Sequence, residues 1–288
     1  MAAGGGRCVL ERWTVAVEGP TAGVAAALSE AVAPRVGALA WDTVVRGPLT
    51  FLECRFDATA DTGALPPAIA ASLADWIVGV RQADLLARLI GQRYTSFGRE
   101  EQSRILALAQ ARLASGTDGP AGRRAQVRRR LADYLEHHQS VVLDGFVTFR
   151  LKDYMDDLAG AVDQAVEDFV LEREYREFLE LLRYVVESRA DRPARVHCFL
   201  QPDGVFSLED DSGSGLGPPD TDVVDQRGVG MEDFLVSALV TLAPRRVELH
   251  LPGGGALSGD ALTTLDEVFA GAVGVCAGCE RCARRARG

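Results

Sequence analysis

The sequence predicts a mixed α/β protein (α+β) in which two small α/β units flank a helical segment. Both ends of the chain alternate short β-type runs with helical patterns, whereas the middle carries helical periodicity alone. We place the three segments at residues 1–93, 94–190 and 191–288. The 288 residues slightly exceed the roughly 250 that one hydrophobic core usually supports, which favours more than one folding unit.

The first segment is predicted to be a small β-α-β-β-α unit. Bulky and small residues alternate over 13–17 as in a short strand, and Gly47-Pro48 is a turn dipeptide between two β runs. Thr21 is a suitable N-cap for an alanine-rich helix, and Pro66-Pro67 opens a second helix. The predicted elements are a strand over 13–17, a helix over 21–32, strands over 40–45 and 49–56, and a helix over 68–90.

The central segment is predicted to be helical, with a loop at 115–122 where Gly, Pro, Ser and Asp gather. Helices are expected over 103–113 and 123–138. From 146 to 188 apolar residues recur mostly every three or four positions, which predicts one or two long amphipathic helices. Oppositely charged residues four apart, such as Arg173 and Glu177, support the same assignment.

The last segment is predicted to be a ββ-α-β-α-β unit with a cysteine-rich tail. A tight turn at 201–204 separates two β runs and favours a hairpin. The stretch 209–225 is acidic and rich in Pro and Gly, so we expect a mobile loop there. The predicted elements are strands over 195–200 and 205–208, a helix over 231–242, a strand over 246–250, a helix over 257–269 and a strand over 273–275.

Composition excludes several functional classes. With 41 acidic and 31 basic residues the formal charge is −10, which argues against wholesale nucleic-acid binding. No window approaches the roughly 18 continuous apolar residues of a membrane span, and the start has no secretory signal pattern. Six cysteines in a chain of this length are typical of a cytosolic protein rather than a disulfide framework. We therefore expect a cytoplasmic protein with no membrane partner.

The strongest chemical motif is the tail, where Cys276, Cys279 and Cys282 are spaced by two residues. This spacing lets successive thiolates close on one metal, as in zinc knuckles and in ferredoxin-type iron–sulfur runs. The motif lacks a fourth cysteine, so a further ligand is needed, and we take His250 as the leading candidate. The alternatives for that ligand are Cys198, His197, a second chain or an exogenous thiol. Plain reduced thiols, or a pair that cycles as a disulfide, explain the motif equally well.

Other constellations give weaker signals. The glycine-rich stretch 252–255 could cradle phosphate but fits neither the dinucleotide pattern nor a P-loop, so a plain turn is favoured. Basic residues over 123–130 could bind phosphates or an acidic partner, but a solvated face docked on the acidic helix beyond residue 150 is favoured. No local motif proposes a catalytic set, so an enzyme is not predicted. The candidate partner-binding residues are Arg123, Arg124, Arg128, Arg150, Lys152 and Tyr154.

Two stretches of the central segment resemble the YtxC-like family of sporulation proteins, which occur in spore-forming bacteria. They are Gly145–Tyr154 (GFVTFRLKDY) and Ala165–Tyr184 (AVEDFVLEREYREFLELLRY). The strand around His197, the helix end at Pro244 and the cysteine-rich finish agree as well, so the resemblance spans roughly residues 90–282. It implies a sporulation context and a cytoplasmic setting but no reaction, and Lys152, the chain's single lysine, lies inside its motif.

Three functions therefore follow as hypotheses. The first is a binding or regulatory role in spore formation, exercised on a protein partner. The second is a metal or thiol-redox protein that uses the cysteine tail with zinc or an iron–sulfur cluster. The third is a nucleic-acid binder acting through the basic helix at 123–130, the least favoured of the three.

Overall fold

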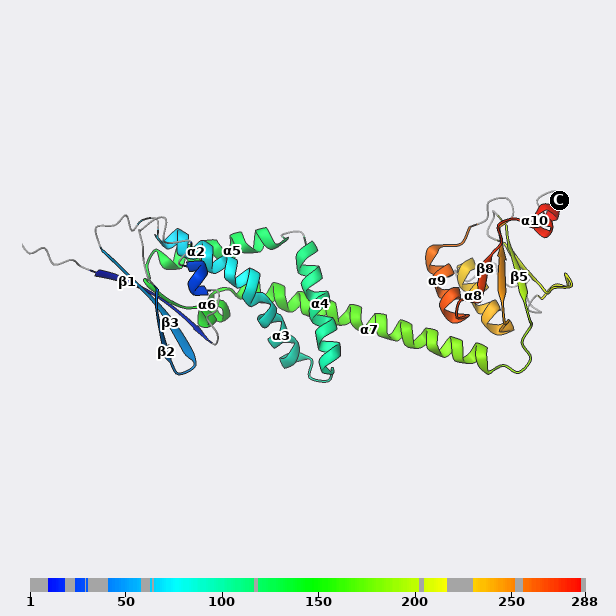
Figure 1. The fold of residues 1–288 in the computed structure, drawn as a ribbon, viewed down its shortest axis with the longest axis horizontal. Helices are drawn as coiled ribbons and strands as arrows, with labels where there is room; N and C mark the ends of the chain where they lie inside the picture. Colours follow the sequence, from blue (N-terminus) through cyan, green and yellow to red (C-terminus); the bar gives the residue numbers. More distant parts are fainter. Residues whose placement is uncertain are drawn as a thin grey trace, which may run out of the picture. The chain divides into compact units, whose positions relative to one another are not determined.

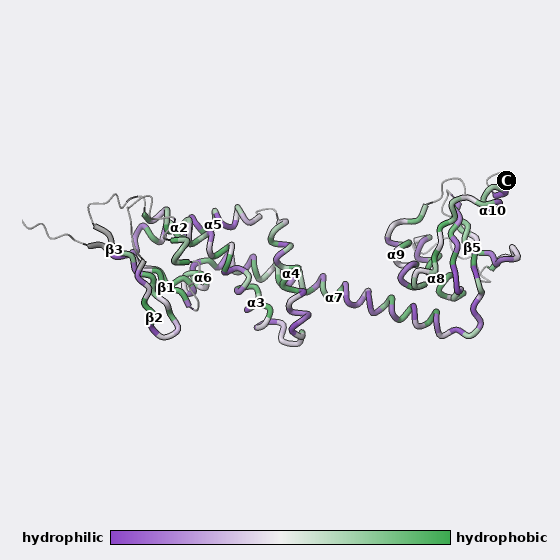
Figure 2. The backbone as a smooth tube through the Cα atoms, in the orientation of Figure 1, coloured by the Kyte–Doolittle hydropathy of each residue, from purple (hydrophilic) through white to green (hydrophobic). Residues whose placement is uncertain are grey.

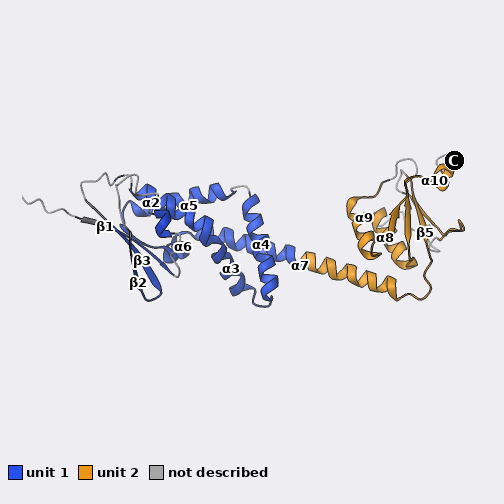
Figure 3. Cartoon of the chain, viewed as in Figure 1, with its two compact units in different colours: residues 1–170 blue, residues 171–288 orange. Residues whose placement is uncertain are grey.

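The computed structural model divides the chain into two compact units, residues 1–170 and 171–288 (Figures 1 and 3). Each unit has its own hydrophobic core and is described by itself. The structure describes residues 10–18, 24–28, 30, 41–57, 63, 65–116, 119–201, 205–216, 230–251 and 256–285.

The first unit contains a four-stranded sheet in the order β2-β3-β1-β4. The antiparallel strands β1 (Leu10–Glu18), β2 (Trp41–Arg46) and β3 (Leu49–Asp57) match the predicted β runs, and Gly47 between the last two has φ +62°, which glycine adopts without strain. The stretch 140–143, predicted only as a connection, instead forms β4 (Ser140–Val142) parallel to β1. Three residues are too few for a periodic pattern, so pairing with β1 creates this strand.

Helices cover this sheet and complete the core of the first unit. The predicted helix over 68–90 is longer and contains a π-helical turn, running as α2 (Leu65–Trp76), η2 (Ile77–Arg81) and α3 (Gln82–Arg93). It is followed by α4 (Arg99–Ser115) and α5 (Gly119–Leu135), so the loop expected at 115–122 is shorter than predicted. Residues 24–28 are helical, and the rest of the helix expected at 21–32 lies outside the described residues except for Glu30.

The predicted long amphipathic stretch forms two helices, α6 (Leu143–Arg150) and α7 (Lys152–Ser188). Figure 2 shows hydrophobic and hydrophilic residues alternating along α7. In the first unit its carboxylates meet arginines from three other helices: Arg93 with Asp163, Arg112 with Asp168 and Arg130 with Asp153. The acidic face of this helix is therefore partly neutralised by ion pairs. The 170/171 boundary between the units falls inside α7.

The second unit has the predicted ββ-α-β-α-β order. Its sheet runs β6-β5-β7-β8, with β5 (Val196–Leu200) antiparallel to β6 (Phe206–Glu209) and parallel to β7 (Val247–His250), which is parallel to β8 (Val273–Val275). The helices α8 (Met231–Leu242) and α9 (Gly259–Val268) provide the connections into β7 and β8. Their buried residues share one core with Cys198 and Leu249, so they pack on one face of the sheet.

The opposite face of this sheet carries a different set of residues. Alternation along β5 and β7 places His197, Phe199 and His250 on the face away from Cys198 and Leu249. All five residues of β5 are nevertheless buried, so both faces are covered. A short terminal helix that the sequence analysis did not anticipate, α10 (Glu280–Arg285), contacts this second face through Arg285.

The mixed α/β fold class is confirmed, with helices in both units and a small sheet in each. The first unit, residues 1–170, includes the first predicted segment and most of the second, and its described buried residues form one hydrophobic core. Residues 210–215 of the expected mobile loop form an ordered turn, in which Asp210 Oδ1 accepts hydrogen bonds from Ser212 and Ser214. No helix in the described part of the chain is long and apolar enough to cross a membrane.

Candidate metal centre

Four side chains with metal-ligating atoms converge at one end of the second unit. They are His250, Cys276, Cys279 and Cys282, and their ligand atoms all lie within 4.8 Å of one another. These are the three motif cysteines together with the histidine chosen as the leading fourth ligand. Among the residues that the structure describes, no other group of three or more metal-ligating side chains was found.

Strand pairing brings the first two ligands together. His250 is the last residue of β7, and the backbone N–H of Cys276 donates to the carbonyl of Leu249 at 2.8 Å. This bond extends the pairing of β7 and β8 by one residue, so Cys276 leaves the sheet beside His250. The chain then turns at Gly278, whose φ of +119° suits glycine and whose N–H lies 3.4 Å from the Cys276 sulfur.

The other two ligands come from the start of α10. Cys279 directly precedes this helix and Cys282 is three residues further on, so both side chains share one helix face. The sulfur of Cys279 accepts a hydrogen bond from the backbone N–H of Cys282, as an N-cap side chain does. The local fold therefore holds two cysteines on a helix start and points them at the exit of the sheet.

The separations agree with a single tetrahedral ion. The Cys282 sulfur lies 3.7 Å from that of Cys279 and 3.9 Å from that of Cys276. Zinc–sulfur bonds of about 2.3 Å in a tetrahedron place two sulfurs about 3.8 Å apart, and a sulfur and a nitrogen about 3.6 Å apart. His250 Nδ1 lies 3.6 Å from Cys279 Sγ and 3.2 Å from Cys282 Sγ. An iron–sulfur cluster would need its sulfurs further apart, because inorganic sulfide and several irons lie between them.

A chain of hydrogen bonds runs from His250 away from the sulfurs. His250 Nε2 lies 2.9 Å from His197 Nδ1, and His197 Nε2 lies 3.0 Å from Asp211 Oδ1. Since a carboxylate only accepts, His197 carries its proton on Nε2 and accepts on Nδ1 when neutral. His250 must then donate from Nε2, which leaves the Nδ1 lone pair facing the sulfurs. The network thus selects the histidine tautomer that a metal requires.

Two arginines and an aromatic ring hold α10 against the sheet around this network. Phe199 stacks on His250 with ring centroids 4.4 Å apart, and the Arg285 guanidinium lies 4.2 Å from the Phe199 centroid. Arg285 also pairs with Glu209, while Arg281 donates to the backbone carbonyls of Asp210 and Asp211. The helix α10 and the residue before it therefore carry two of the ligands, and the arginines of α10 hold the loop that contains Asp211.

The electrostatics favour a bound cation. Burial, followed by the proximity of His197, lowers the pKa of His250, so its imidazole is kept neutral. The hydrogen bond from the Cys282 N–H lowers the pKa of Cys279, whereas burial raises the pKa of Cys282 to about 11. Three thiols this close cannot all ionise without a compensating charge, and a divalent cation would supply that charge.

The remaining ligand alternatives take other places. Cys198 lies on the opposite face of β5, in the core, where burial raises its pKa to about 12. His197 is the hydrogen-bond partner of His250 Nε2 and does not face the sulfurs. This role of His197 and the contribution of Asp211 were not predicted from the sequence. Nothing in the sequence pattern pairs the two histidines, because His197 lies inside the predicted strand 195–200 and His250 ends the predicted strand 246–250.

The six candidate partner-binding residues do not form one surface. Arg123 is buried and donates to the backbone carbonyl of Leu113, and Tyr154 is buried with its hydroxyl 3.3 Å from Gln82 Oε1. Both side chains serve the core of the first unit. The exposed members are Arg124, which lies 3.4 Å from Asp75, together with Arg128, Arg150 and Lys152. The glycine-rich stretch at 252–255 lies outside the described residues.

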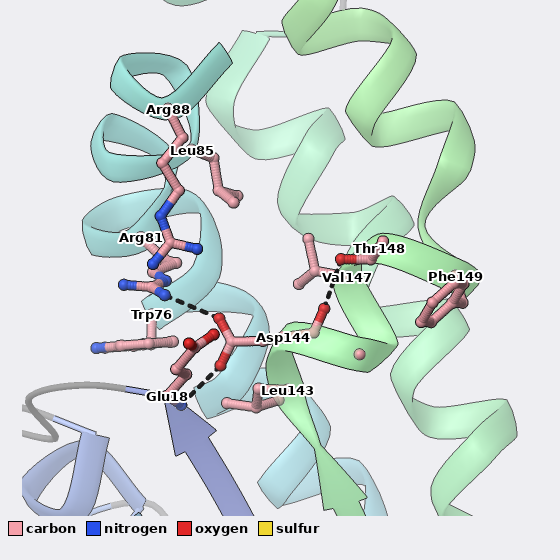
Figure 4. A pocket seen from close by; sticks show the side chains of 11 residues that line it. Glu18, Trp76, Arg81, Leu85, Arg88, Leu143, Asp144, Val147, Thr148 and Phe149 are labelled. Atoms are coloured by element: carbon pink, nitrogen blue, oxygen red, sulfur yellow. Dashed lines mark hydrogen bonds and ion pairs between the residues drawn. The ribbon is translucent and has the colours of Figure 1, made fainter. Parts of the chain in front are cut away.

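A cavity of about 320 Å³ in the first unit contains a buried ion pair (Figure 4). Arg81 donates to Asp144 Oδ1 at 2.8 Å, and Asp144 Oδ2 accepts the backbone N–H of Glu18 at 2.7 Å. Asp144 thus ties the end of β1 and the start of α6 to the π-helical turn. Its charges are internally paired, so this arrangement is explained as a structural clamp.

Comparisons with known proteins identify the family. The sequence model of the YtxC-like family matches residues 67–274, which includes His197 and His250 and stops two residues before Cys276. A curated relative, "Uncharacterized protein YtxC" of Bacillus subtilis (strain 168), is 24% identical over 189 residues. That alignment covers 62% of this chain and 66% of the relative, just under two thirds of its length. No solved structure matches the chain. Because the family match spans well over half of the sequence, the chain belongs to the YtxC-like family.

Proposed function

We propose that the second unit binds one Zn²⁺ through His250 Nδ1 and the thiolates of Cys276, Cys279 and Cys282. The observation that carries this proposal is the convergence of four ligand atoms within 4.8 Å at separations that fit one tetrahedral ion. Three thiolates and one imidazole complete the coordination of zinc, so the site is structural rather than catalytic. Its role is to fix the chain after β8 onto the sheet.

Zinc is preferred over the other readings of the cysteine motif. An iron–sulfur cluster is disfavoured by the short sulfur–sulfur separations of 3.7 and 3.9 Å. A thiol-redox pair is disfavoured because a neutral, hydrogen-bonded imidazole is aimed at the sulfurs, which a ligand requires and a disulfide exchange does not.

Metal analysis of the full-length protein tests the proposal. We expect one equivalent of zinc after purification under reducing conditions, and its loss in Cys279→Ser and His250→Ala variants. Cys54→Ser is the matched control, because Cys54 lies in the core of the first unit. An absence of tightly bound metal, or full retention in both ligand variants, would contradict zinc binding.

A cytoplasmic binding or regulatory role in spore formation, on a protein partner, is the second candidate function. Its support is membership of the YtxC-like family together with the resemblance of 145–154 and 165–184 to that family's sporulation proteins. Deletion of the gene in its host followed by counts of heat-resistant spores tests it. A normal spore count in the deletion strain would remove this candidate, and complementation with the Cys279→Ser variant would show whether the metal site matters to it.

A further inference from the structure

The second half of α7 exposes an unusual number of large apolar side chains. Twelve large hydrophobic residues of the described chain are exposed, and six of them lie within fifteen residues of this helix. Their exposed fractions range from 43% for Val185 to 71% for Tyr184. A surface of this density marks an interaction site rather than scattered exposure. The six, called the α7 face below, are Leu171, Tyr175, Phe178, Leu181, Tyr184 and Val185.

The other side of the same helix is already occupied within the second unit. Leu179 and Val186 are buried in its core, and Arg183 donates to the backbone carbonyl of Glu267 in α9. The hydroxyls of Tyr175 and Thr264 lie 2.8 Å apart, so Tyr175 marks the edge between the two sides. The helix is thus fixed in rotation. Tyr175 and Phe178 also line a cavity of about 530 Å³ between α7 and the helices α8 and α9, so they form the inner edge of the α7 face. Leu171, Leu181, Tyr184 and Val185 do not line this cavity and form the outer part of the face.

The spacing of the α7 face is that of a helix–helix seam. Leu171, Phe178 and Val185 are seven residues apart, and Leu181 lies three residues after Phe178 and four before Val185. Residues repeating every three and four positions form a continuous stripe that a second helix can pack along. An apolar stripe two heptads long predicts a helical partner.

We propose that the α7 face of one copy packs antiparallel on the α7 face of a second copy. With the twofold axis between residues 179 and 180, Phe178 of each copy meets Leu181 of the other, and Val185 meets the stem of Glu174. The stripe is therefore complementary to itself, which a symmetric dimer requires. A parallel arrangement would instead place each Glu174 and Glu177 beside its own equivalent, and like charges at such positions are destabilising.

The size of the face fits a dimer of moderate affinity. Six side chains that are roughly half exposed offer on the order of 600 Å² of apolar surface per copy, somewhat below the roughly 800 Å² per partner of a standard stable interface. We therefore expect dissociation in the micromolar range rather than an obligate dimer. The zinc site contributes no residue to this face, so dimerisation does not depend on the proposed function.

Sedimentation equilibrium of the full-length protein over about three decades of concentration around the micromolar range tests the dimer. The expected result is a reversible monomer–dimer equilibrium that Phe178→Glu and Leu181→Glu each weaken by about tenfold or more. Phe149→Glu is the matched control, because Phe149 is 73% exposed on α6 in the first unit. Circular dichroism checks that the variants remain folded.

A photo-crosslinking residue at position 174, in a mixture of ¹⁴N- and ¹⁵N-labelled protein, reports the orientation. Crosslinks between copies to the peptide around Val185 support the antiparallel packing, whereas crosslinks from 174 to 174 contradict it. A protein that stays monomeric at every concentration, or a dimer that neither folded variant weakens, would overturn the proposal. In that case a different protein covers the face.

Discussion

Replacing His197 by Phe tests whether the hydrogen-bond chain behind His250 supports metal binding. Phenylalanine keeps an aromatic ring of similar size but removes the Nδ1 acceptor that lies 2.9 Å from His250 Nε2. His250 is only 2% exposed, so water cannot readily replace the lost partner. An unpaired buried N–H costs about 1–3 kcal/mol, and outer-shell substitutions typically reduce metal affinity about 10- to 100-fold. The two figures agree, because 10- to 100-fold corresponds to about 1.4–2.7 kcal/mol.

The assay is competition for zinc between the protein and a chelator of known affinity, at fixed pH and ionic strength. We expect the His197→Phe variant to bind zinc about 10- to 100-fold more weakly. The Asp211→Asn variant should bind within about threefold of wild type, since its amide oxygen still accepts and its position is solvated. His137→Phe, on the surface of the first unit, is the control.

A second measurement separates ligand positioning from general destabilisation. The ¹⁵N shifts of the His250 ring in the zinc-free protein should show a proton on Nε2 in wild type and a mixture of tautomers in His197→Phe. Zinc affinity of His197→Phe within twofold of wild type, with an unchanged tautomer, would refute the reasoning.

Three further predictions follow from the same structure. Removing the metal with a chelator should speed tryptic cleavage after Arg281 and Arg284, because α10 is then no longer held by the metal ligands. Cleavage after the exposed Arg99 of the first unit should stay unchanged. Equal cleavage rates at Arg281 with and without chelator would contradict a structural role of the metal. Asp144→Ala should cost about 1.5–3 kcal/mol of unfolding free energy in urea denaturation, because the buried Arg81 loses its less exposed partner and keeps only the solvent-exposed Asp84 at 3.1 Å. Asp84→Ala, at a side chain 62% exposed, should cost less than about 0.5 kcal/mol. Burial raises the pKa of Cys198 from 9.0 to about 12, so the contribution of this thiol to stability is fully present below about pH 9 and is lost as the pH rises towards 12. Between these pH values the unfolding free energy should fall by about 1.4 kcal/mol more per pH unit in wild type than in Cys198→Val. Parallel pH profiles of the two proteins would disprove this prediction.

Most regular elements could be predicted because their patterns are local. The periodicity of 146–188 and the turn at Gly47-Pro48 depend only on neighbours in sequence, and both are confirmed. What escaped prediction depends on distant contacts. The strand β4 has three residues and exists because it pairs with β1, and α10 is a single short helix held by Arg285 and Glu209.

In the candidate site, too, residues that are close in sequence could be predicted, and residues brought together by distant contacts could not. Two-residue spacing identified the three cysteines, because ligands that close on one ion can be neighbours in sequence. His250 was the leading candidate among several fourth ligands, and only the fold brings it to the three cysteines, since 25 residues that include α9 lie between it and Cys276. His197 and Asp211 could not be assigned from sequence, because their role depends on the register of β5 against β7 and on a turn that returns to the strand end. Arg123 was expected at the surface because runs of arginine usually are solvated, but its stem is buried and its guanidinium satisfies the backbone carbonyl of Leu113.

The most direct test of the proposed zinc centre is X-ray absorption at the zinc edge of the full-length protein after zinc is added. The geometry predicts a first shell of three sulfurs at about 2.3 Å and one nitrogen at about 2.0–2.1 Å, with no second metal nearby. Loss of the nitrogen in His250→Ala would complete the assignment. A shell of oxygen and nitrogen alone, or of four sulfurs, would contradict the account.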